Sequence, residues 1–368
     1  MIRPPELAVI GAGIVGASIA RRLAERGLRV TVLEAKRPAG GTSLATFGWV
    51  NAVGKQPRGY FDLNVSGMAE HLALRDELDD GDWYHPGGNL EWSREADELA
   101  SRVEHHRAWG YRVELVDAAA ARDLEPDVVP PDDTVAAFYP DDAWIDVGPL
   151  VRRLLDHPGI RLMWPSKVIG LATAGPRVVG LRLADGRELT VDQVVVCAGP
   201  HTHEIAEWCG FALPMRRSPG LLATTEPGPI DVRRILHLPG LALRPDGAGR
   251  LLLANDGLDR QIELSGGSLP LADAAGELMR RAVEVVPRLA GVSIASQRVG
   301  QRALTADGRP AVGPIPGCDG VYLAVMHSGV TLGPYVARLA AGEIADGVAD
   351  ARLDDYRPDR FSDVAVPA

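Results

Sequence analysis

The apolar residues near the N-terminus form two compact runs separated by an amphipathic stretch. Residues 7–10 (LAVI) and 28–35 (LRVTVLEA) are short and rich in β-branched side chains, which predicts two buried strands. Residues 14–27 have helical periodicity between them and end at Gly27, a residue typical of helix C-terminal stops. This strand–helix–strand order predicts a parallel sheet covered by helices.

The rest of the chain continues the same mixture of helices and strands. Helices are expected over residues 60–78, 95–110, 147–159, 271–286 and 332–347. Alternating residues on both sides of Asp185-Gly186 predict a hairpin, and VDQVVVCAG (191–199) and VYLAV (321–325) predict buried strands. Residues 211–298 are expected to hold strands and the one helix at 271–286, and the polar tail after Asp350 is expected to fray.

The length and the charge of the chain narrow its class. A chain of 368 residues is long enough for two domains. It carries 39 Lys and Arg against 49 Asp and Glu, a formal charge of −10, with no basic tail or stripe. Nucleic acid and anionic membrane are therefore poor partners, and an acidic substrate would have to be held by locally placed arginines.

The cysteines and the N-terminal run indicate a cytoplasmic protein. Cys197, Cys209 and Cys318 form no C-x-x-C pattern, which is typical of a reduced compartment. The apolar run from Leu7 is explained by its spaced glycines, so we expect no export signal, and no apolar stretch is long enough to cross a bilayer.

The histidines show no metal-binding pattern. His105-His106 are adjacent, His201 and His203 are two apart, and none belongs to an H-E-x-x-H motif. Since neighbours one or two apart on a helix face different ways, we interpret these histidines as solvated or locally bonded. No metal site is expected.

The segment 11–16 (GAGIVG) is a G-x-G-x-x-G motif between the first strand and the first helix. Its glycines allow a tight turn, close approach of a pyrophosphate and close helix–strand packing, and the helix N-terminus offers amide N–H groups to phosphates. Glu34, which ends the next strand, is placed to accept both ribose hydroxyls. A carboxylate at this position disfavours a 2′-phosphate, so NADP is not the expected cofactor. The alternative is a sheet-end turn with a solvated Glu34.

The order of the later segments favours FAD over NAD. A glycine-rich loop (40–43, GGTS) follows Glu34, then the hairpin insertion, and only near the C-terminus do a last strand and helix return. A long cofactor such as FAD suits that order. An NAD-dependent dehydrogenase that uses only the N-terminal motif is the alternative.

At these residues the chain resembles the D-amino-acid oxidase, glycine oxidase and sarcosine oxidase family of flavoproteins. The resemblance covers nearly the whole chain and is thin over about 80–140 and 211–298. It implies an α/β (α+β) fold: a glutathione-reductase-like FAD-binding domain with a parallel central sheet, interleaved with a substrate domain built on an antiparallel sheet. The FAD-binding domain is expected over residues 1–80, 143–210 and 299–350. The substrate domain is expected over residues 81–142 and 211–298, and the tail over residues 351–368.

The resemblance also implies which residues contact FAD. The expected contacts, which begin with the glycine motif, are Gly11, Ala12, Gly13, Ile14, Val15, Glu34, Ala35, Lys36, Thr42, Ser43, Gly48, Trp49, Val168, Ala198, Gly199, Ser328, Gly329, Val330 and Thr331. The alternative for the loop at 42–43 is an ordinary Thr/Ser-stabilised turn. In the family the C-terminal turn, HSGVTLGP (327–334) here, places amide N–H groups near the flavin pyrimidine edge.

Two departures from the family bear on the cofactor. Pro200-His201 follows Ala198-Gly199, where relatives often have Ala-Trp. Sarcosine-oxidase-like members tether the flavin through a cysteine just before the arginine segment, and residues 298–302 contain none. Non-covalent FAD is therefore expected.

Segment 299–313 (VGQRALTADGRPAVG) resembles the family segment whose arginine clamps the substrate carboxylate, which maps onto Arg302. A planar guanidinium matches a carboxylate with two parallel donors. The alternative is a surface arginine paired with Asp307. Trp49, His327 and Asn255 are candidate substrate contacts, His327 with a structural alternative.

The family's substrate-contacting tyrosines are not evident in residues 241–256. This absence favours a secondary or cyclic amine acid over the substrates of the best-known D-amino-acid oxidases.

The resemblance implies an FAD-dependent enzyme that oxidises the C–N bond of an amino acid or related amine to an imine by hydride transfer to flavin N5. Deprotonation of the amine suffices in such enzymes, and no obvious side-chain base is present. Oxygen or another acceptor would reoxidise the flavin. The alternatives are a flavin-binding subunit of a larger dehydrogenase complex and an FAD enzyme acting on a hydroxy acid.

Overall fold

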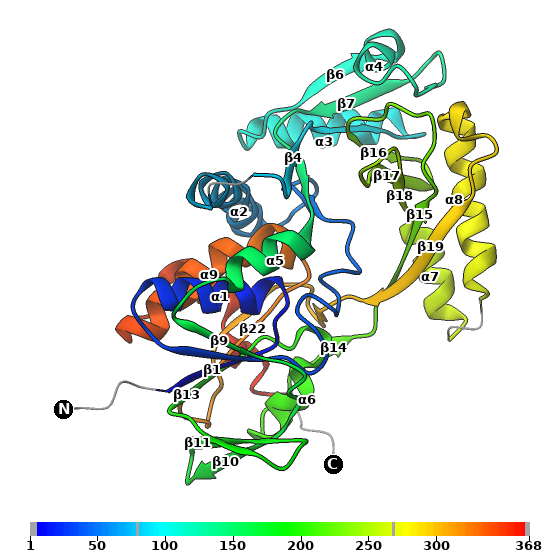
Figure 1. Cartoon of the computed structure of the whole chain (residues 1–368). Helices are drawn as coiled ribbons and strands as arrows, with labels where there is room; N and C mark the ends of the chain where they lie inside the picture. The colour runs from blue at the N-terminus through cyan, green and yellow to red at the C-terminus, as the bar shows by residue number, and fades with distance from the viewer. Residues whose placement is uncertain (1–5, 79–80, 267–268, 365–368) are drawn as a thin grey trace.

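The computed structural model describes residues 6–78, 81–266 and 269–364. Its first part is built on a six-stranded sheet in the order β21-β22-β13-β1-β2-β9 (Figure 1). Its members are β1 (Leu7–Ile10), β2 (Val30–Leu33), β9 (Ile160–Met163), β13 (Gln193–Val196), β22 (Val321–Val325) and β21 (Ala311–Pro314). All neighbouring pairs are parallel except β21–β22 at the edge, so the predicted parallel sheet is confirmed.

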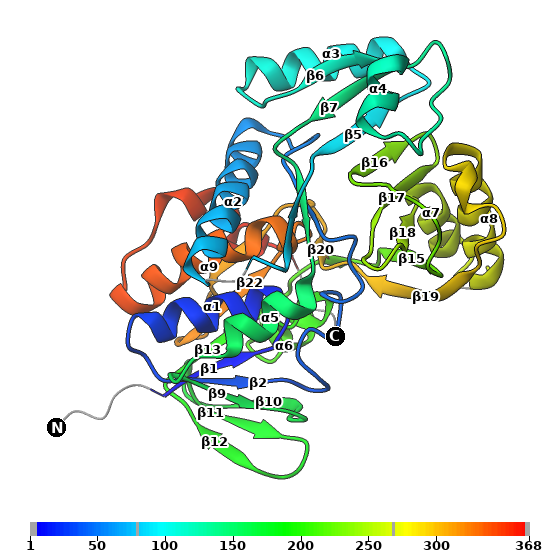
Figure 2. The ribbon, with the colours of Figure 1, turned by 45° about the horizontal axis from the view of Figure 1, so that its top comes forward.

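Both faces of this sheet are covered, which explains why its strands are apolar throughout. Leu7 and Val9 of β1 pack with a cluster of helices, whereas Ala8 and Ile10 belong to the core on the other face. The helices are α1 (Ile14–Glu25), α2 (Arg58–Glu77), α5 (Val147–Leu155) and α9 (Gly329–Asp346). The other face carries β10 (Val168–Ala174), β11 (Arg177–Leu183) and β12 (Glu188–Thr190), which include the predicted hairpin (Figure 2).

The second part is an eight-stranded sheet in the order β19-β15-β18-β17-β16-β5-β7-β6. Its members are β5 (Asn89–Trp92), β6 (Glu114–Asp117), β7 (Val135–Tyr139), β15 (Pro219–Thr225), β16 (Ile235–Leu238), β17 (Leu241–Pro245), β18 (Leu251–Ala254) and β19 (Ile294–Gln301). Every pair is antiparallel except β5–β16. Two distant stretches of chain thus share one sheet, and the expected interleaved α/β architecture is confirmed.

Further helices and strands connect and flank the two parts. They are α3 (Ala96–Ala108), α4 (Ala118–Leu124), α6 (Thr202–Glu207), α7 (Asp256–Leu264), α8 (Leu271–Val285), β3 (Trp49–Val50), β4 (Tyr84–Pro86), β8 (Ala143–Ile145), β14 (Met215–Arg216) and β20 (Leu304–Thr305). The bounds expected for the two domains stay a prediction, and β19 extends past residue 298. None of the helices in the described ranges has the length and apolar content needed to cross a bilayer.

Two expectations about local structure are wrong. A helix, α7, precedes the predicted one in the 211–298 segment, because Asn255 caps it through Oδ1, which accepts the Leu258 N–H at 2.8 Å. As far as residue 364 the chain after Asp350 does not fray: it forms 3-10 helices over Ala351–Tyr356 and Pro358–Phe361. The expectation for residues 365–368 lies outside the described part of the chain. Arg357 in this stretch donates to the nearly buried Glu343 of α9 at 2.6 Å, which holds the tail on the first part.

The contact between α2 and α9 depends on Gly67. A Cβ atom at this position would collide with the backbone carbonyl oxygen of Thr331. The two helices therefore approach more closely here than any other residue would permit, and this contact sets the position of the first turn of α9.

We expect Gly67→Ala to lower the free energy of unfolding by about 1–3 kcal/mol, because α2 must move away from α9 to admit the methyl group. Gly276→Ala is the matched control: Gly276 also lies inside a helix, but a Cβ atom added there would have nothing within 4 Å of it. This control should raise the stability by about 0.5–1 kcal/mol. Urea unfolding followed by circular dichroism measures both, and equal effects of the two substitutions would contradict the packing argument.

Candidate cofactor and substrate site

The first turn of α1 lies closely against the ends of two strands. Gly11 has φ of +104°, and a Cβ there would collide with the carbonyl oxygen of Cys197 at the end of β13. A Cβ on Gly16 would collide with the carbonyl oxygen of Gly11. Only glycine fits at either position, so the motif builds a backbone cradle at the carboxyl edge of the sheet, next to Ala198.

Glu34 is held at the same edge by main-chain donors. Its Oε2 accepts the Ala12 N–H at 3.0 Å, and its Oε1 accepts the Lys36 N–H at 2.8 Å. Its carbonyl oxygen accepts the Ser166 N–H at 2.7 Å, which fixes the chain two residues before Val168. The carboxylate is therefore preorganised beside the glycine turn, where the sequence placed it.

The loop after β2 reaches both the cradle and the segment that precedes Arg302. Ser43 Oγ accepts the Ile14 N–H, in the first turn of α1, at 3.0 Å. Thr42 Oγ1 donates to the carbonyl oxygen of Gln301 at 2.6 Å. These two neighbouring hydroxyls thus connect the N-terminal motif with the C-terminal arginine segment.

The first turn of α9 is attached to the same loop. Thr331 Oγ1 donates to the carbonyl oxygen of Trp49 at 3.2 Å and accepts the Asn51 N–H at 3.3 Å. Gly329 is close enough to α1 that a Cβ would lie 3.3 Å from Val15 Cγ2. The first turn of α9 contains no acidic side chain, so its positive dipole end is not neutralised from within the helix.

Several of the cofactor residues expected from the sequence are therefore joined by direct contacts. Most of them belong to the first turns of α1 and α9 and to the loop between β2 and β3. Ala198 and Gly199 follow β13, and Val168 begins β10. Two helix N-termini, a preorganised carboxylate and glycines with no room for a side chain are chemically suited to a dinucleotide that carries both phosphates and a ring that becomes negatively charged.

Trp49 belongs to a buried polar network that the sequence did not indicate. Its Nε1 donates to Asp142 Oδ2 at 2.9 Å, and its indole stacks on the His237 ring with centroids 4.0 Å apart. Tyr111 donates its hydroxyl proton to the other oxygen of Asp142. Trp49 and Asp142 are 93 residues apart in the chain, and no local pattern marks their contact.

Asp142 and His237 both have shifted pKa values. Burial raises the pKa of Asp142 to about 8, against the opposing hydrogen bonds from Tyr111 and Trp49. Burial lowers the pKa of His237 to about 4, and its Nδ1 lies 2.9 Å from Asn89 Oδ1. Both groups are therefore predominantly neutral at pH 7, and the wall behind Trp49 carries little charge.

Arg302 does not pair with Asp307. Its Nη2 donates to Asp259 Oδ2 at 2.5 Å and to Asp256 Oδ1 at 3.1 Å, and its Nη1 donates to the Pro219 carbonyl at 2.8 Å. Asp307 instead accepts from Arg360 at 2.9 Å. The alternative of a surface Arg302 paired with Asp307 is therefore wrong. The reason is that α7, a helix that the sequence did not predict, supplies the carboxylates of Asp256 and Asp259 instead.

Asn255 and His327, the remaining candidate substrate contacts, lie in different environments. The Asn255 amide oxygen caps α7, directly before Asp256. The His327 side chain reaches solvent, yet the surrounding protein desolvates it and, with the charges of Lys55 and Arg302, lowers its pKa to about 4. The carboxylate of Asp256 opposes this shift. His327 is therefore neutral at pH 7.

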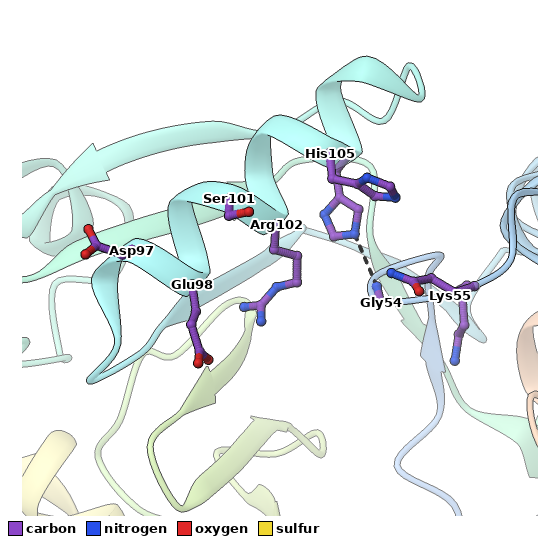
Figure 3. Close-up of a pocket in the computed structure, with 9 residues that line it drawn as sticks. Gly54, Lys55, Asp97, Glu98, Ser101, Arg102 and His105 are labelled. Atoms are coloured by element: carbon purple, nitrogen blue, oxygen red, sulfur yellow. Dashed lines mark hydrogen bonds between the residues drawn. The ribbon is translucent and has the colours of Figure 1, made fainter.

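A cavity of about 570 Å³ lies between α3 and the loop after β3 (Figure 3). It is lined by Gly54, Lys55, Gln56, Asp97, Glu98, Ser101, Arg102, His105 and His106.

The expectation that His105-His106 are solvated or locally bonded needs correction for His106. This side chain is only 2% exposed and accepts the Gly54 N–H at 3.2 Å, since the loop after β3 packs on α3. Within the described part of the chain, no group of three or more His, Cys, Asp or Glu could hold a metal.

Asp142→Asn should change how stability depends on pH. An unfolded aspartate titrates near pH ~4, so the folded state holds the extra proton between pH 4 and about 8. The free energy of unfolding of the native protein should fall relative to that of D142N as the pH rises, by as much as about 1.4 kcal/mol per unit. Urea unfolding from pH 5 to 8 measures the difference. Asp133→Asn, at an exposed position, is the control, and parallel curves for D142N and the native protein would contradict the buried-acid assignment.

The chain is similar to known proteins in sequence and in fold. The model of the family described as FAD dependent oxidoreductase matches residues 6–343. Glycine oxidase from Pseudomonas aeruginosa is 27% identical over 360 residues, which cover 90% of this chain and 93% of that protein. Two solved structures are similar in fold. Iminodiacetate oxidase from Chelativorans sp. BNC1 has a TM-score of 0.83 and 23% identity, over 96% of this chain and 99% of that one. L-proline dehydrogenase from P. horikoshii has a TM-score of 0.85 and 19% identity, over the whole of both chains.

These matches confirm the resemblance drawn from the sequence and the cofactor that it implied. The chain belongs to the FAD dependent oxidoreductase family and is an FAD-dependent enzyme related to the amino-acid and amine oxidases.

Proposed function

We propose that this enzyme oxidises the C–N bond of an amino acid, and in particular of a secondary or cyclic amine that carries a carboxylate, to an imine. The observation that carries the proposal is the convergence described above. The loop that bonds to α1 through Ser43 and to α9 through Trp49 also bonds, through Thr42, to the residue before Arg302. A cofactor seated along this path would end close to a cationic group suited to a substrate carboxylate.

FAD would be held without a covalent bond. The glycine turn and Ser43 would receive its phosphates, Glu34 its ribose hydroxyls, and the first turn of α9 its pyrimidine edge. When bound, FAD supplies the acceptor of the hydride that leaves the carbon next to the amine. The amide N–H groups of Gly329, Val330 and Thr331 would stabilise negative charge at that end of the site.

Arg302 would anchor the substrate carboxylate. Its bonds to Pro219, Asp256 and Asp259 use Nη1 and Nη2, and its Nε–H makes no hydrogen bond to the described residues. Asp259 has a nearly buried side chain, whereas the Asp256 side chain is 84% exposed. We propose that a substrate carboxylate displaces the exposed Asp256 from the guanidinium and leaves the buried pair with Asp259 intact.

The surrounding charge favours an anionic substrate. Lys55, Arg302 and Arg216 all lower the pKa of His327, and Asp256 opposes them. A local excess of cations in a chain of net charge −10 is the arrangement that an acidic ligand requires.

His327 itself, neutral at pH 7, is too weak a base to remove a proton from an ammonium group efficiently. The amine would therefore lose its proton to solvent before the C–H bond breaks.

Two relatives in fold are named for secondary amines, namely iminodiacetate and L-proline. Their fold likeness agrees with the lack of an aromatic substrate contact in residues 241–256. It supports the preference for a secondary or cyclic amine in this chain.

We expect the purified protein to be yellow and to lose its flavin absorbance anaerobically when a secondary amino acid such as sarcosine or proline is added. The screen should include both enantiomers, primary amino acids and hydroxy acids such as lactate. If lactate is the only compound that reduces the flavin, the substrate is a hydroxy acid and not an amine. If no compound reduces the isolated holoprotein, the interpretation of this chain as an independently active amine oxidoreductase is wrong.

We expect Arg302→Lys to raise the KM of a carboxylate-bearing amine by about tenfold or more, because an ammonium group cannot form two parallel bonds. Lysine keeps a positive charge beside the buried Asp259, which Arg302→Leu would leave unpaired. The matched control is Arg338→Lys, because the half-exposed Arg338 side chain also pairs with a buried carboxylate, that of Glu70. Steady-state kinetics with a substrate and its decarboxylated analogue measure the effect, and an unchanged KM would remove the carboxylate anchor from the proposal.

A further inference from the structure

Lys55 lies on the wall of the cavity beneath α3, in the loop that follows β3. The loop is held in place, because the Gly54 N–H donates to His106 Nε2 at 3.2 Å and the Lys55 N–H donates to the Ala52 carbonyl at 3.3 Å. Lys55 and Arg102 both line the cavity, and Figure 3 shows Lys55 on the loop across from Arg102 of α3, with its side chain directed away from that helix. The position of the ammonium group is thus set by anchored backbone.

The ammonium group of Lys55 has no anionic partner in the described part of the chain. Among residues 6–78, 81–266 and 269–364, no carboxylate is within ion-pair distance of it, and no hydrogen bond from Nζ is present. Arg102, the other basic group with a long side chain in the cavity, is already paired with Glu91. Burial lowers the pKa of Lys55 and no carboxylate offsets this effect. A partly buried cation without a counter-charge gains from binding an anion.

The same ammonium group lies within electrostatic range of the proposed substrate site. Its charge acts on His327, as does the charge of Arg302. The acidic residues of the cavity, Asp97 and Glu98, are in the first turn of α3, and Figure 3 shows them at the end away from Lys55. Lys55 and Arg302 are therefore two cations that act on the same neutral histidine.

We propose that Lys55 binds a second carboxylate of the substrate, so that the preferred substrates are amine dicarboxylates whose other carboxylate is held by Arg302. The inference rests on the proposed function and adds the substrate class. Two arms that each carry a carboxylate can extend from one secondary amine nitrogen, so such a molecule presents anions on both sides of the reacting C–N bond. His327, being neutral, repels neither carboxylate nor amine.

The subsite is tested by binding of two ligands that differ in one carboxylate and cannot be oxidised as amines. Diglycolate has two carboxymethyl arms on an ether oxygen, and methoxyacetate has one arm and a methyl group. Each is titrated into the holoprotein by calorimetry, with the flavin absorbance recorded in parallel. The variants are Lys55→Gln, the charge-preserving Lys55→Arg, and the control Lys167→Gln at an exposed position.

We expect the native protein and K167Q to bind diglycolate about tenfold to a hundredfold more tightly than methoxyacetate, the range typical of a hydrogen-bonded charge contact. K55Q should lose most of this preference, while its affinity for methoxyacetate stays within about twofold of the native value. K55R, which keeps the positive charge, should show the preference again. No preference in the native protein, or a preference that survives in K55Q, would overturn the proposal.

These outcomes do not depend on C–N oxidation, because neither ligand contains nitrogen. If the holoprotein prefers diglycolate but no amine reduces it, the subsite stands and the proposed reaction fails. If amines reduce it and the preference is absent, the reaction stands and the subsite fails. Thermal melting of each variant checks the fold, which the Lys55 substitutions should leave intact since its side chain makes no bond in the described structure.

Discussion

The close approach of the first turn of α1 to the ends of β1 and β13 is the constraint on which the site depends. Cβ atoms at Gly11 and Gly16 would collide with backbone carbonyl oxygens, so neither position tolerates a side chain without movement of a strand or the helix. Because the helix begins at this point, its first amide N–H groups lie near the edge where Glu34 follows β2. A displacement here would move the carboxylate, the loop hydroxyls and the helix dipole away from one another.

The interleaved fold turns this local cradle into a longer site. The segment from Thr42 to Trp49 makes hydrogen bonds to four other parts of the chain: Ser43 to α1, Thr42 to Gln301, and Trp49 to α9 and to Asp142. Each contact is made by an adjacent or nearby residue, so one short segment sets the spacing between the cofactor path and the arginine segment. The eight-stranded sheet then supplies the far wall, through His237 stacked on Trp49.

The charges around the site are mostly positive, whereas the net charge of the chain is negative. The protein carries a net charge of −10, yet three cations act on His327 and one carboxylate opposes them. Behind Trp49 the titratable groups are held neutral, since burial raises the pKa of Asp142 and lowers that of His237. An anion entering this region would meet positive charge on the open side and an uncharged wall behind it.

The sequence by itself determined the features that depend on neighbouring residues. The glycine motif, the helix that it begins, Glu34 at the end of the next strand and the Asp185-Gly186 hairpin all follow from spacing and backbone conformation within about thirty residues. The family, its fold and its cofactor followed from the order of such motifs, which is also a property of the linear chain.

The tertiary structure decided which side chains are partners across the fold. Arg302 meets Asp259, 43 residues away, because α7 returns to β15 and β19, and a helix capped by one asparagine left little trace in the local pattern. Asp142 reaches Trp49 across 93 residues. That Lys55 has no ion-pair partner among the described residues likewise depends on every segment packed around it. Such contacts depend on where long chain segments pack, and packing is specified by the summed burial of many residues rather than by any short motif.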